Sequence, residues 1–198
     1  MNETSSQLQI LFQYLVALVK NPVQQIRTLP TIEWKTLIIF QFCLSLTSVI
    51  LSNLLAPFAI SILNVLVSLA AAVVATTLVS LFFYYFFQIL YNRTLDFIRV
   101  FTLVLFAHIP FAIFHLAAHF FPPADLIGIG LSAILMIIGL VENFEIPKKV
   151  AIQLMIGVYS IFLIYWITQL ILRPYGNLIT EPHDLDLLEK EVHQRLEK

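Results

Sequence analysis

Charged residues are absent from the long stretch between Thr36 and Asn92. These 57 residues contain no Asp, Glu, Lys, Arg or His. A membrane-spanning helix requires about 20 mostly apolar residues, so this stretch alone accommodates two spans. A soluble domain in a chain of 198 residues has no core large enough to bury such a run. The sequence therefore predicts a polytopic membrane protein.

Other residue types are scarce as well. Charged residues make up 12% of the chain, against about 25% in soluble domains. The single cysteine, Cys43, excludes an internal disulfide, and the five glycines form no phosphate-binding loop. Gly-x-Ser-x-Gly and His-Glu-x-x-His motifs are also missing. We therefore expect no enzymatic activity, no catalytic residues and no cofactor.

The net charge of −1 and the lack of a basic stripe argue against a nucleic-acid partner. The expected partners are the lipid bilayer and other membrane proteins, including a second copy of this chain.

Five apolar segments are long enough to span a bilayer. They are residues Leu37–Ala56, Phe58–Tyr91, Val100–Phe121, Ala124–Val141 and Lys149–Leu172. The second segment has 34 residues, or about 51 Å as a helix, and the hydrocarbon core is about 30 Å thick. It is expected to be one long helix that is tilted or projects from the membrane. The predicted fold class is an all-α, five-span transmembrane helix bundle.

A shorter apolar segment, Leu8–Val19, precedes the spans. Its apolar residues recur at helical spacing, and they are Leu8, Leu11, Phe12, Leu15, Leu18 and Val19. About 12 residues are too few to span the membrane, and no basic region or cleavage site of a signal peptide is present. We interpret this segment as an interfacial amphipathic helix ended by Asn21-Pro22. The alternative is that the same face packs against the spans.

The chain divides into a cytoplasmic segment (1–35), a five-span membrane domain (36–173) and a hydrophilic tail (174–198). In the tail, residues Asp184–Lys198 are expected to form a short helix, with an apolar seam formed by Leu185, Leu188, Val192 and Leu196. This helix would either dock on a partner or fold back on its own domain.

Basic residues alternate between the two sides of the predicted bundle. Lys20, Arg27 and Lys35 precede the first span, Arg93 and Arg99 follow the second, and Lys148 and Lys149 follow the fourth. The other two loops carry none. Because cytoplasmic loops are enriched in Lys and Arg, the pattern predicts a cytoplasmic N-terminus and a periplasmic C-terminus in the inner membrane.

Small and polar residues form helical stripes on the first two spans. Tight contact between helices in lipid favours such residues, so the two stripes are expected to meet as an antiparallel pair. They contain Gln41, Ser45, Ser48 and Ser52 on the first span, and Ser61, Asn64, Ser68, Ala72 and Ala75 on the second. On the fourth span, Gly128, Ser132 and Gly139 indicate another close contact. The alternative is that the stripes line a polar path.

Three histidines lie on the third span. His108, His115 and His119 fall within about 40° of one helical face, and the last two have the spacing of a helical zinc-ligand pair. Ionisable groups at membrane depth are candidate proton or metal sites. No Cys, Asp or Glu on the same segment offers a third ligand, which favours a hydrogen-bonded packing role. Which metal would bind, if any, stays open.

The loop between the fourth and fifth spans concentrates charge. Glu142, Glu145, Lys148 and Lys149 lie within eight residues and could bind a partner or a lipid headgroup. The alternative is that they only end one span and begin the next, with Pro147 in the first helical turn.

Several short motifs resemble those of the Ypt/Rab-interacting-protein (YIP) domain family. Asn21-Pro22, Ile26-Arg27 and Trp34-Lys35 resemble its entry segment, Phe106-Ala107-His108-Ile109-Pro110 its third span, and Gly128–Glu145 with Ile146-Pro147 its fourth span and following loop. The chain lacks the long N-terminal region of eukaryotic members and has Leu105-Phe106 in place of a Gly-Tyr pair, so it resembles the short bacterial members. The resemblance implies five spans with a cytoplasmic N-terminus and lends the histidines no role.

Two functions follow as hypotheses. The first is a non-enzymatic scaffold or membrane-organising protein. The second is a small transporter or channel that uses the polar stripes and the histidines. Transporters often contain internal repeats and several broken spans. No repeat is evident here, and only Pro110 interrupts a span, which favours the scaffold.

Overall fold

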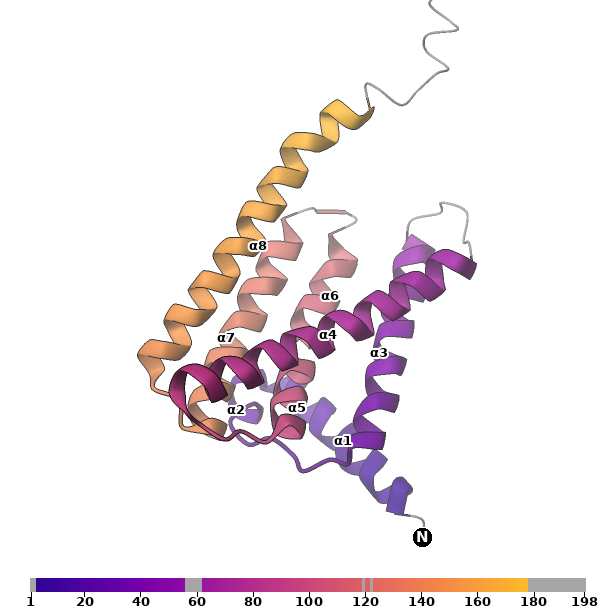
Figure 1. Cartoon of the computed structure of the whole chain (residues 1–198). Helices are drawn as coiled ribbons and strands as arrows, with labels where there is room; N and C mark the ends of the chain where they lie inside the picture. The colour runs from indigo at the N-terminus through magenta and orange to yellow at the C-terminus, as the bar shows by residue number, and fades with distance from the viewer. Residues whose placement is uncertain (1–2, 56–61, 119, 122, 178–198) are drawn as a thin grey trace, which may run out of the picture. The chain divides into compact units, whose positions relative to one another are not determined.

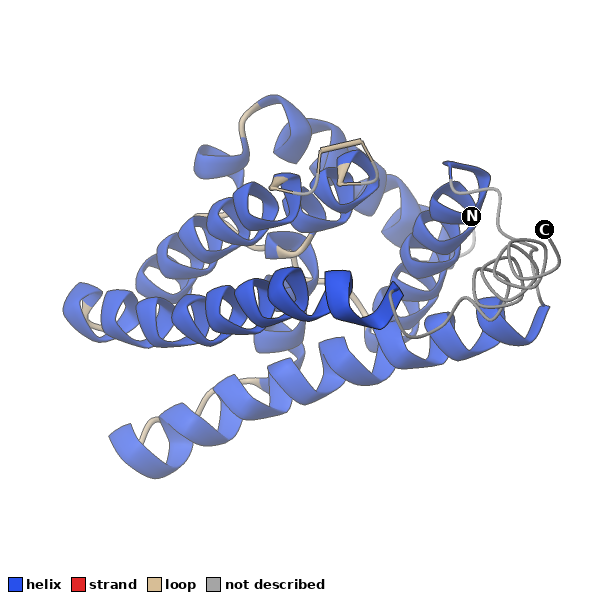
Figure 2. Ribbon diagram, turned by 90° about the horizontal axis from the view of Figure 1, so that it is seen from above, coloured by secondary structure: helices blue, strands red, loops and turns tan. Residues whose placement is uncertain are grey.

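The fold comes from a computed structural model that describes residues 3–55, 62–118, 120–121 and 123–177 of the 198-residue chain. These residues form helices and no strand (Figure 1; Figure 2). The helices are α1 (Glu3–Lys20), α2 (Pro22–Gln25), α3 (Trp34–Leu55), α4 (Ile62–Tyr91), α5 (Phe97–Ala107), α6 (Ile109–Ala117), α7 (Ala124–Phe144) and α8 (Lys148–Asn177). The chain divides into two compact units, residues 1–156 and 157–198.

Five helical segments are long and apolar enough to cross a membrane, which confirms the predicted fold class. They are α3, α4, the pair α5–α6, α7 and α8. The first span begins at Trp34 rather than Leu37, because the Trp34 ring packs 5.0 Å from that of Phe101. The fourth span continues past Val141 to Phe144, which is buried. The predicted tail helix, Asp184–Lys198, lies outside the described residues.

The third span is two helices, whereas the sequence was interpreted as one segment. Pro110 has no N–H to donate, and its ring excludes a regular helical turn before it. The helix therefore ends at Ala107, passes through His108 and resumes at Ile109. The Phe111 amide donates to Ser132 Oγ of α7 at 3.3 Å. A side chain of a neighbouring helix thus supplies an acceptor next to the break.

Helix α5, the N-terminal half of this span, is the most buried helix of the first unit. All eight residues from Val100 to Ala107 are buried. The third span as a whole is half buried, whereas the other spans bury between 11% and 33% of their residues. Helices α3, α4, α6 and α7 all contact α5.

Helix α1 packs against this core through one side only. Leu11, Tyr14 and Leu18 are buried, and the Tyr14 ring lies 4.6 Å from the ring of Phe106. The Tyr14 hydroxyl donates to the carbonyl oxygen of Gln25 at 3.0 Å. Burial raises the pKa of Tyr14, so the hydroxyl keeps its proton and stays a donor. The alternative interpretation of this segment, packing against the spans, therefore holds for part of its apolar face.

Asn21 separates α1 from α2. Its Oδ1 accepts a hydrogen bond from the Gln24 amide at 3.3 Å, and Pro22 occupies the first helical position. This is the capping arrangement that Asn followed by Pro favours. The Asn-Pro pair that was expected to end the amphipathic helix also begins the next one.

Helix α4 is a single uninterrupted helix, as expected, and 30 of its residues are described. The predicted start at Phe58 lies outside the described residues. The helix runs obliquely across the bundle in Figure 1. At 1.5 Å per residue it is about 45 Å long, so a tilt fits it to the membrane better than an upright position.

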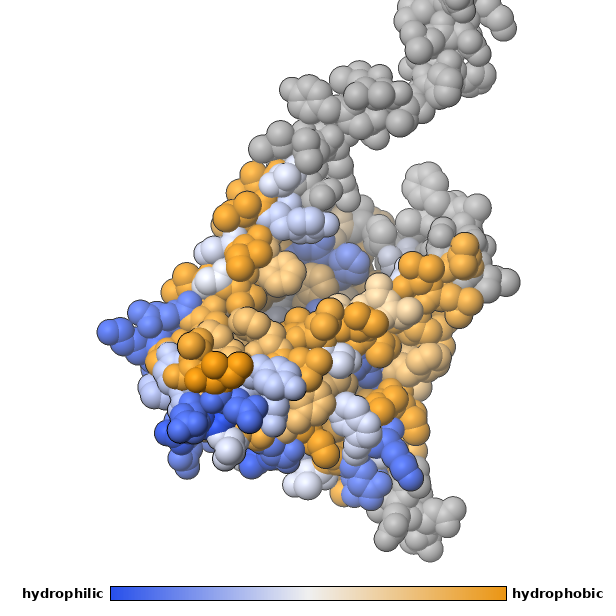
Figure 3. Space-filling model, viewed as in Figure 1, coloured by the Kyte–Doolittle hydropathy of each residue, from blue (hydrophilic) through white to orange (hydrophobic). Residues whose placement is uncertain are grey.

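The basic residues of the first unit lie at one end. They are Lys20, Arg27, Lys35, Arg93, Arg99, Lys148 and Lys149, and all are exposed. They flank the start of α3, the end of α4, the start of α5 and the start of α8, which lie together in Figure 1. Many hydrophilic residues gather at this end in Figure 3, while apolar residues cover the middle. The alternation of basic and non-basic loops in the sequence thus places the basic residues at one end of the bundle.

Candidate functional site

The histidines lie where the third span breaks and where it ends. His108 occupies the break between α5 and α6, and His115 lies in the last turn of α6. His119 lies outside the described residues. The Nδ1 atom of His115 is 2.9 Å from Oδ1 of Asp125 in the first turn of α7. The sequence separated Asp125 from the histidines by a Pro-Pro turn, whereas the fold brings it to His115.

A row of rings joins the two described histidines. The ring of Phe111 lies 4.9 Å from that of His108 and 5.4 Å from that of His115, with which it stacks. The side chains of His115 and Asp125 are 47% and 24% exposed. Within the described residues no three His, Cys, Asp or Glu side chains converge as metal ligands. The contact between His115 and Asp125 links α6 to α7.

The close contact predicted for the fourth span is confirmed. A Cβ atom on Gly128 would lie 2.8 Å from Cβ of Phe114 and 3.0 Å from Cα of Phe111. Ser132 accepts the Phe111 amide, and Gly139 lies against the side chain of Leu103. Residues with small side chains allow α7 to approach α5 and α6 closely, as expected for packing in lipid.

The stripes on the first two spans belong to helices that contact one another. Gln41 is buried, and its Nε2 donates to the carbonyl oxygen of Ala72 at 3.5 Å. Ser45, Ser48 and Ser52 of α3 are partly buried, whereas Ser68 of α4 is exposed. The side chain of Asn64 is outside the described part of the chain. The Gln41–Ala72 bond links the two stripes.

The charged loop is built as a helix terminus. Glu142, Glu145, Lys148 and Lys149 are all exposed. Glu145 has a left-handed backbone (φ 53°, ψ 32°), and its amide bonds to the Leu140 carbonyl, which ends α7. Ile146 is buried, and the Pro147 carbonyl accepts the amide of Ala151 at the start of α8. The loop therefore turns the chain and leaves its four charges accessible.

Comparison with known proteins adds no relative. No family model, curated protein or solved structure matches this chain. Its function is therefore inferred from the geometry of its own residues.

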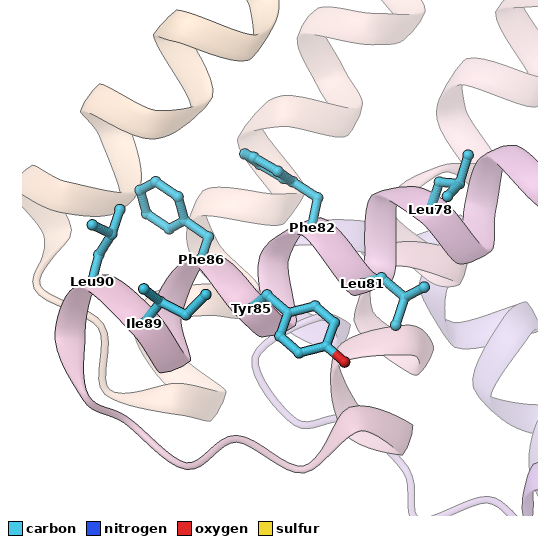
Figure 4. Close-up of a pocket in the computed structure, with 7 residues that line it drawn as sticks. All are labelled: Leu78, Leu81, Phe82, Tyr85, Phe86, Ile89 and Leu90. Atoms are coloured by element: carbon cyan, nitrogen blue, oxygen red, sulfur yellow. The ribbon is translucent and has the colours of Figure 1, made fainter.

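An apolar recess lies on α4. Its volume is about 310 Å³, and seven residues of this helix line it: Leu78, Leu81, Phe82, Tyr85, Phe86, Ile89 and Leu90. In Figure 4, Phe82 and Phe86 project above the axis of α4 and Tyr85 projects below it. The Tyr85 hydroxyl is the one polar side-chain group of this lining, so the recess offers an apolar surface and no catalytic group.

Asn143 was missed as a key residue in the sequence. Its Nδ2 donates to the carbonyl oxygens of Ile26 at 2.9 Å and Gly139 at 3.1 Å, and its Oδ1 accepts the amide of Leu29 at 3.1 Å. The side chain therefore fastens the linker before α3 to the end of α7. A signal existed, since Asn143 extends the stripe of Gly128, Ser132 and Gly139 by one more helical step of four.

Proposed function

We propose that this chain is a non-enzymatic scaffold or membrane-organising protein of the YIP type. It would sit in the inner membrane with its basic end in the cytoplasm and its C-terminus in the periplasm. The observation that carries the proposal is the use of polar groups in the spans. Gln41 and Ser132 bond to the backbone of neighbouring helices. Ser80 and Thr102, both buried, bond to carbonyls of their own helices. The first two bonds link helices, and all four engage polar groups of the spans within the protein.

The outward side of α4 supports an organising role. It exposes large apolar side chains at helical spacing, and these include Leu78, Phe82, Tyr85 and Ile89. In a bilayer this surface faces lipid or another membrane protein. A scaffold requires such a surface, whereas a transporter requires a hydrated path between its helices.

A photo-crosslinking amino acid on α4 tests the proposal in native membranes. Ile89 is 75% exposed and Phe87 is fully buried, so the second position is a matched control on the same helix. We expect a discrete protein adduct from position 89 and none from position 87. Adducts to lipid alone at position 89 would contradict the scaffold.

A small transporter or channel is the second candidate, and the row of His108, Phe111 and His115 favours it. His108 is exposed in the middle of a span, and ionisable side chains at that depth often mark an ion or proton route. The discriminating measurement is the reaction of a cysteine at position 108 with a small water-soluble thiosulfonate, in a Cys43→Ser background. Rapid reaction would favour the transporter, whereas protection would favour the scaffold.

A further inference from the structure

Helix α1 has two apolar sides, of which the bundle covers one. The outer stripe, which we define as Leu8, Phe12 and Val19, is 45%, 68% and 70% exposed. At 100° per residue these three positions fall within about 40° of arc. Gln9, Gln13 and Lys20 follow on the next side of the helix. The helix is therefore fastened by its inner side and presents a separate apolar surface.

Ring contacts fix the depth of α1 relative to the spans. The Tyr14 ring lies 4.6 Å from that of Phe106, and the Phe40 ring lies 5.9 Å from it. Phe106 lies seven residues beyond Arg99, which is about 10 Å along α5. Phe40 lies five residues beyond Lys35, which is about 8 Å along α3. Interfacial helices typically bury their apolar face 5–10 Å below the headgroups. Tyr14 thus lies level with apolar turns of the spans, below their basic ends.

The surface beside α1 is also apolar. Helix α1 contacts α3, and on α3 the side chains of Ile38, Ile39 and Phe42 are exposed at the depth of Phe40. In a membrane-spanning helix these side chains face acyl chains. Helix α3, which α1 contacts, therefore presents a lipid-facing apolar surface at the same depth.

The charges around α1 complement an anionic leaflet. Between α1 and the first turn of α3 lie Lys20, Arg27 and Lys35 against one carboxylate, Glu33, which leaves a formal charge of +2. All four side chains are exposed. Long basic side chains can reach from a submerged helix to the phosphate level, and anionic lipids attract such juxtamembrane groups.

We propose that α1 is embedded in the membrane surface, with its outer stripe among acyl chains and with Lys20 and Arg27 bound to anionic phospholipid headgroups. The outer stripe contacts the lipids of the leaflet in which the basic end of the bundle lies. The inference goes beyond a scaffold role and holds independently of it, because its test measures the depth of α1 and not the capture of a partner.

Site-directed spin labelling tests this placement in the full-length protein. In a Cys43→Ser background, single cysteines replace Phe12 on the outer stripe, Gln13 on the polar side and Leu18 on the inner side. The protein is reconstituted in phosphatidylglycerol–phosphatidylethanolamine vesicles. Collision rates with oxygen, which concentrates in lipid, and with a water-soluble nickel chelate are then compared. We expect oxygen to be favoured at position 12, nickel at position 13, and low access to both at position 18.

Two results at position 12 would overturn the proposal. Access to nickel equal to that at position 13 would place the stripe in water, and low access to both reagents would mean that protein covers it. The headgroup contact has its own test in the Lys20→Gln/Arg27→Gln double variant. Its position-12 label should move toward water in the anionic vesicles and stay unchanged in phosphatidylcholine vesicles. An unchanged depth in the anionic vesicles would refute headgroup binding.

Discussion

Asn143 donates a hydrogen bond to the carbonyl oxygen of Ile26, 117 residues earlier in the chain, at 2.9 Å. The same side chain accepts the amide of Leu29 at 3.1 Å. Two backbone groups of the linker before the first span thus share one carboxamide at the end of the fourth span. Ile26 and Ile32 of the linker are also buried in the core, so these bonds and apolar packing together hold the linker in place.

Replacing Asn143 by Leu should lower the free energy of unfolding by about 1–3 kcal/mol, because partly buried backbone groups lose their partners. Thermal unfolding in detergent measures the change, with Glu142→Gln at the exposed neighbouring position as the control. Tryptic cleavage after Arg27 should also become faster in the Asn143 variant. Wild-type stability together with wild-type cleavage would show that the bonds do not hold the linker.

Gly128→Ala should separate α6 from α7. The new Cβ would lie 3.0 Å from Cα of Phe111, and a backbone atom cannot move away by a side-chain rotation. Overpacking of this kind costs about 1–3 kcal/mol. The matched control is Gly157→Ala, since nothing lies within 4 Å of that position and alanine favours a helix. Thermal stability should fall in the first variant only, and equal stability of the two would contradict the close contact.

Glu145→Gly should stabilise the protein by about 1 kcal/mol. Glu145 has φ of 53°, and glycine adopts this conformation without the steric penalty of a side chain. Glu142→Gly, inside α7, should instead destabilise by about 1 kcal/mol because glycine disfavours a helix interior. Denaturation midpoints of both variants in one detergent compare the two effects. A loss of stability in both would mean that the Glu145 side chain has a role in the loop.

The His115–Asp125 pair should contribute modestly to stability. A double-mutant cycle with His115→Ala and Asp125→Ala is expected to give a coupling of about 0.2–1 kcal/mol, the range for partly exposed ion pairs. Elemental analysis of the purified protein completes the test. Stoichiometric zinc that both single variants lose would instead indicate a metal site and favour the transporter.

Orientation can be measured with two exposed positions in a Cys43→Ser background. Thr94 follows α4 on the basic side, and Phe121 lies between α6 and α7. A membrane-impermeant thiol reagent should label Phe121→Cys in intact cells and Thr94→Cys only after permeabilisation, because basic loops stay in the cytoplasm. The reverse pattern would place the N-terminus outside.

Much of the fold was predictable because membrane spans depend on length and hydropathy. The start of the fourth span at Ala124 was predicted to the residue, and its Gly128 contact followed from the need for small residues between helices in lipid. The split of the third span was harder to read, since Pro110 can either kink a helix or end it, depending on what accepts the next amide. Here the acceptor is Ser132, 21 residues away.

The candidate sites were less predictable because they, too, depend on contacts between residues that are distant in the sequence. The partner of His115 is Asp125, which reaches it only because α6 and α7 form a tight hairpin. The sequence also did not reveal that α1 has one covered and one exposed apolar side, because Leu11 and Phe12 belong to one continuous apolar arc. The contact between Tyr14 and Phe106 and the burial of Leu11 and Leu18 show which part of the arc the bundle covers.

The burial of α5 constrains the order of assembly. Helix α1 leaves the ribosome before Phe106, on which its Tyr14 ring packs, and Asn143 follows later still. Until then α1 can rest on the membrane surface, and the inner side of the helix has no protein to cover it. The inner side of α1 is therefore covered only once α5 is in place, and the linker after it is fastened only once the end of the fourth span is in place.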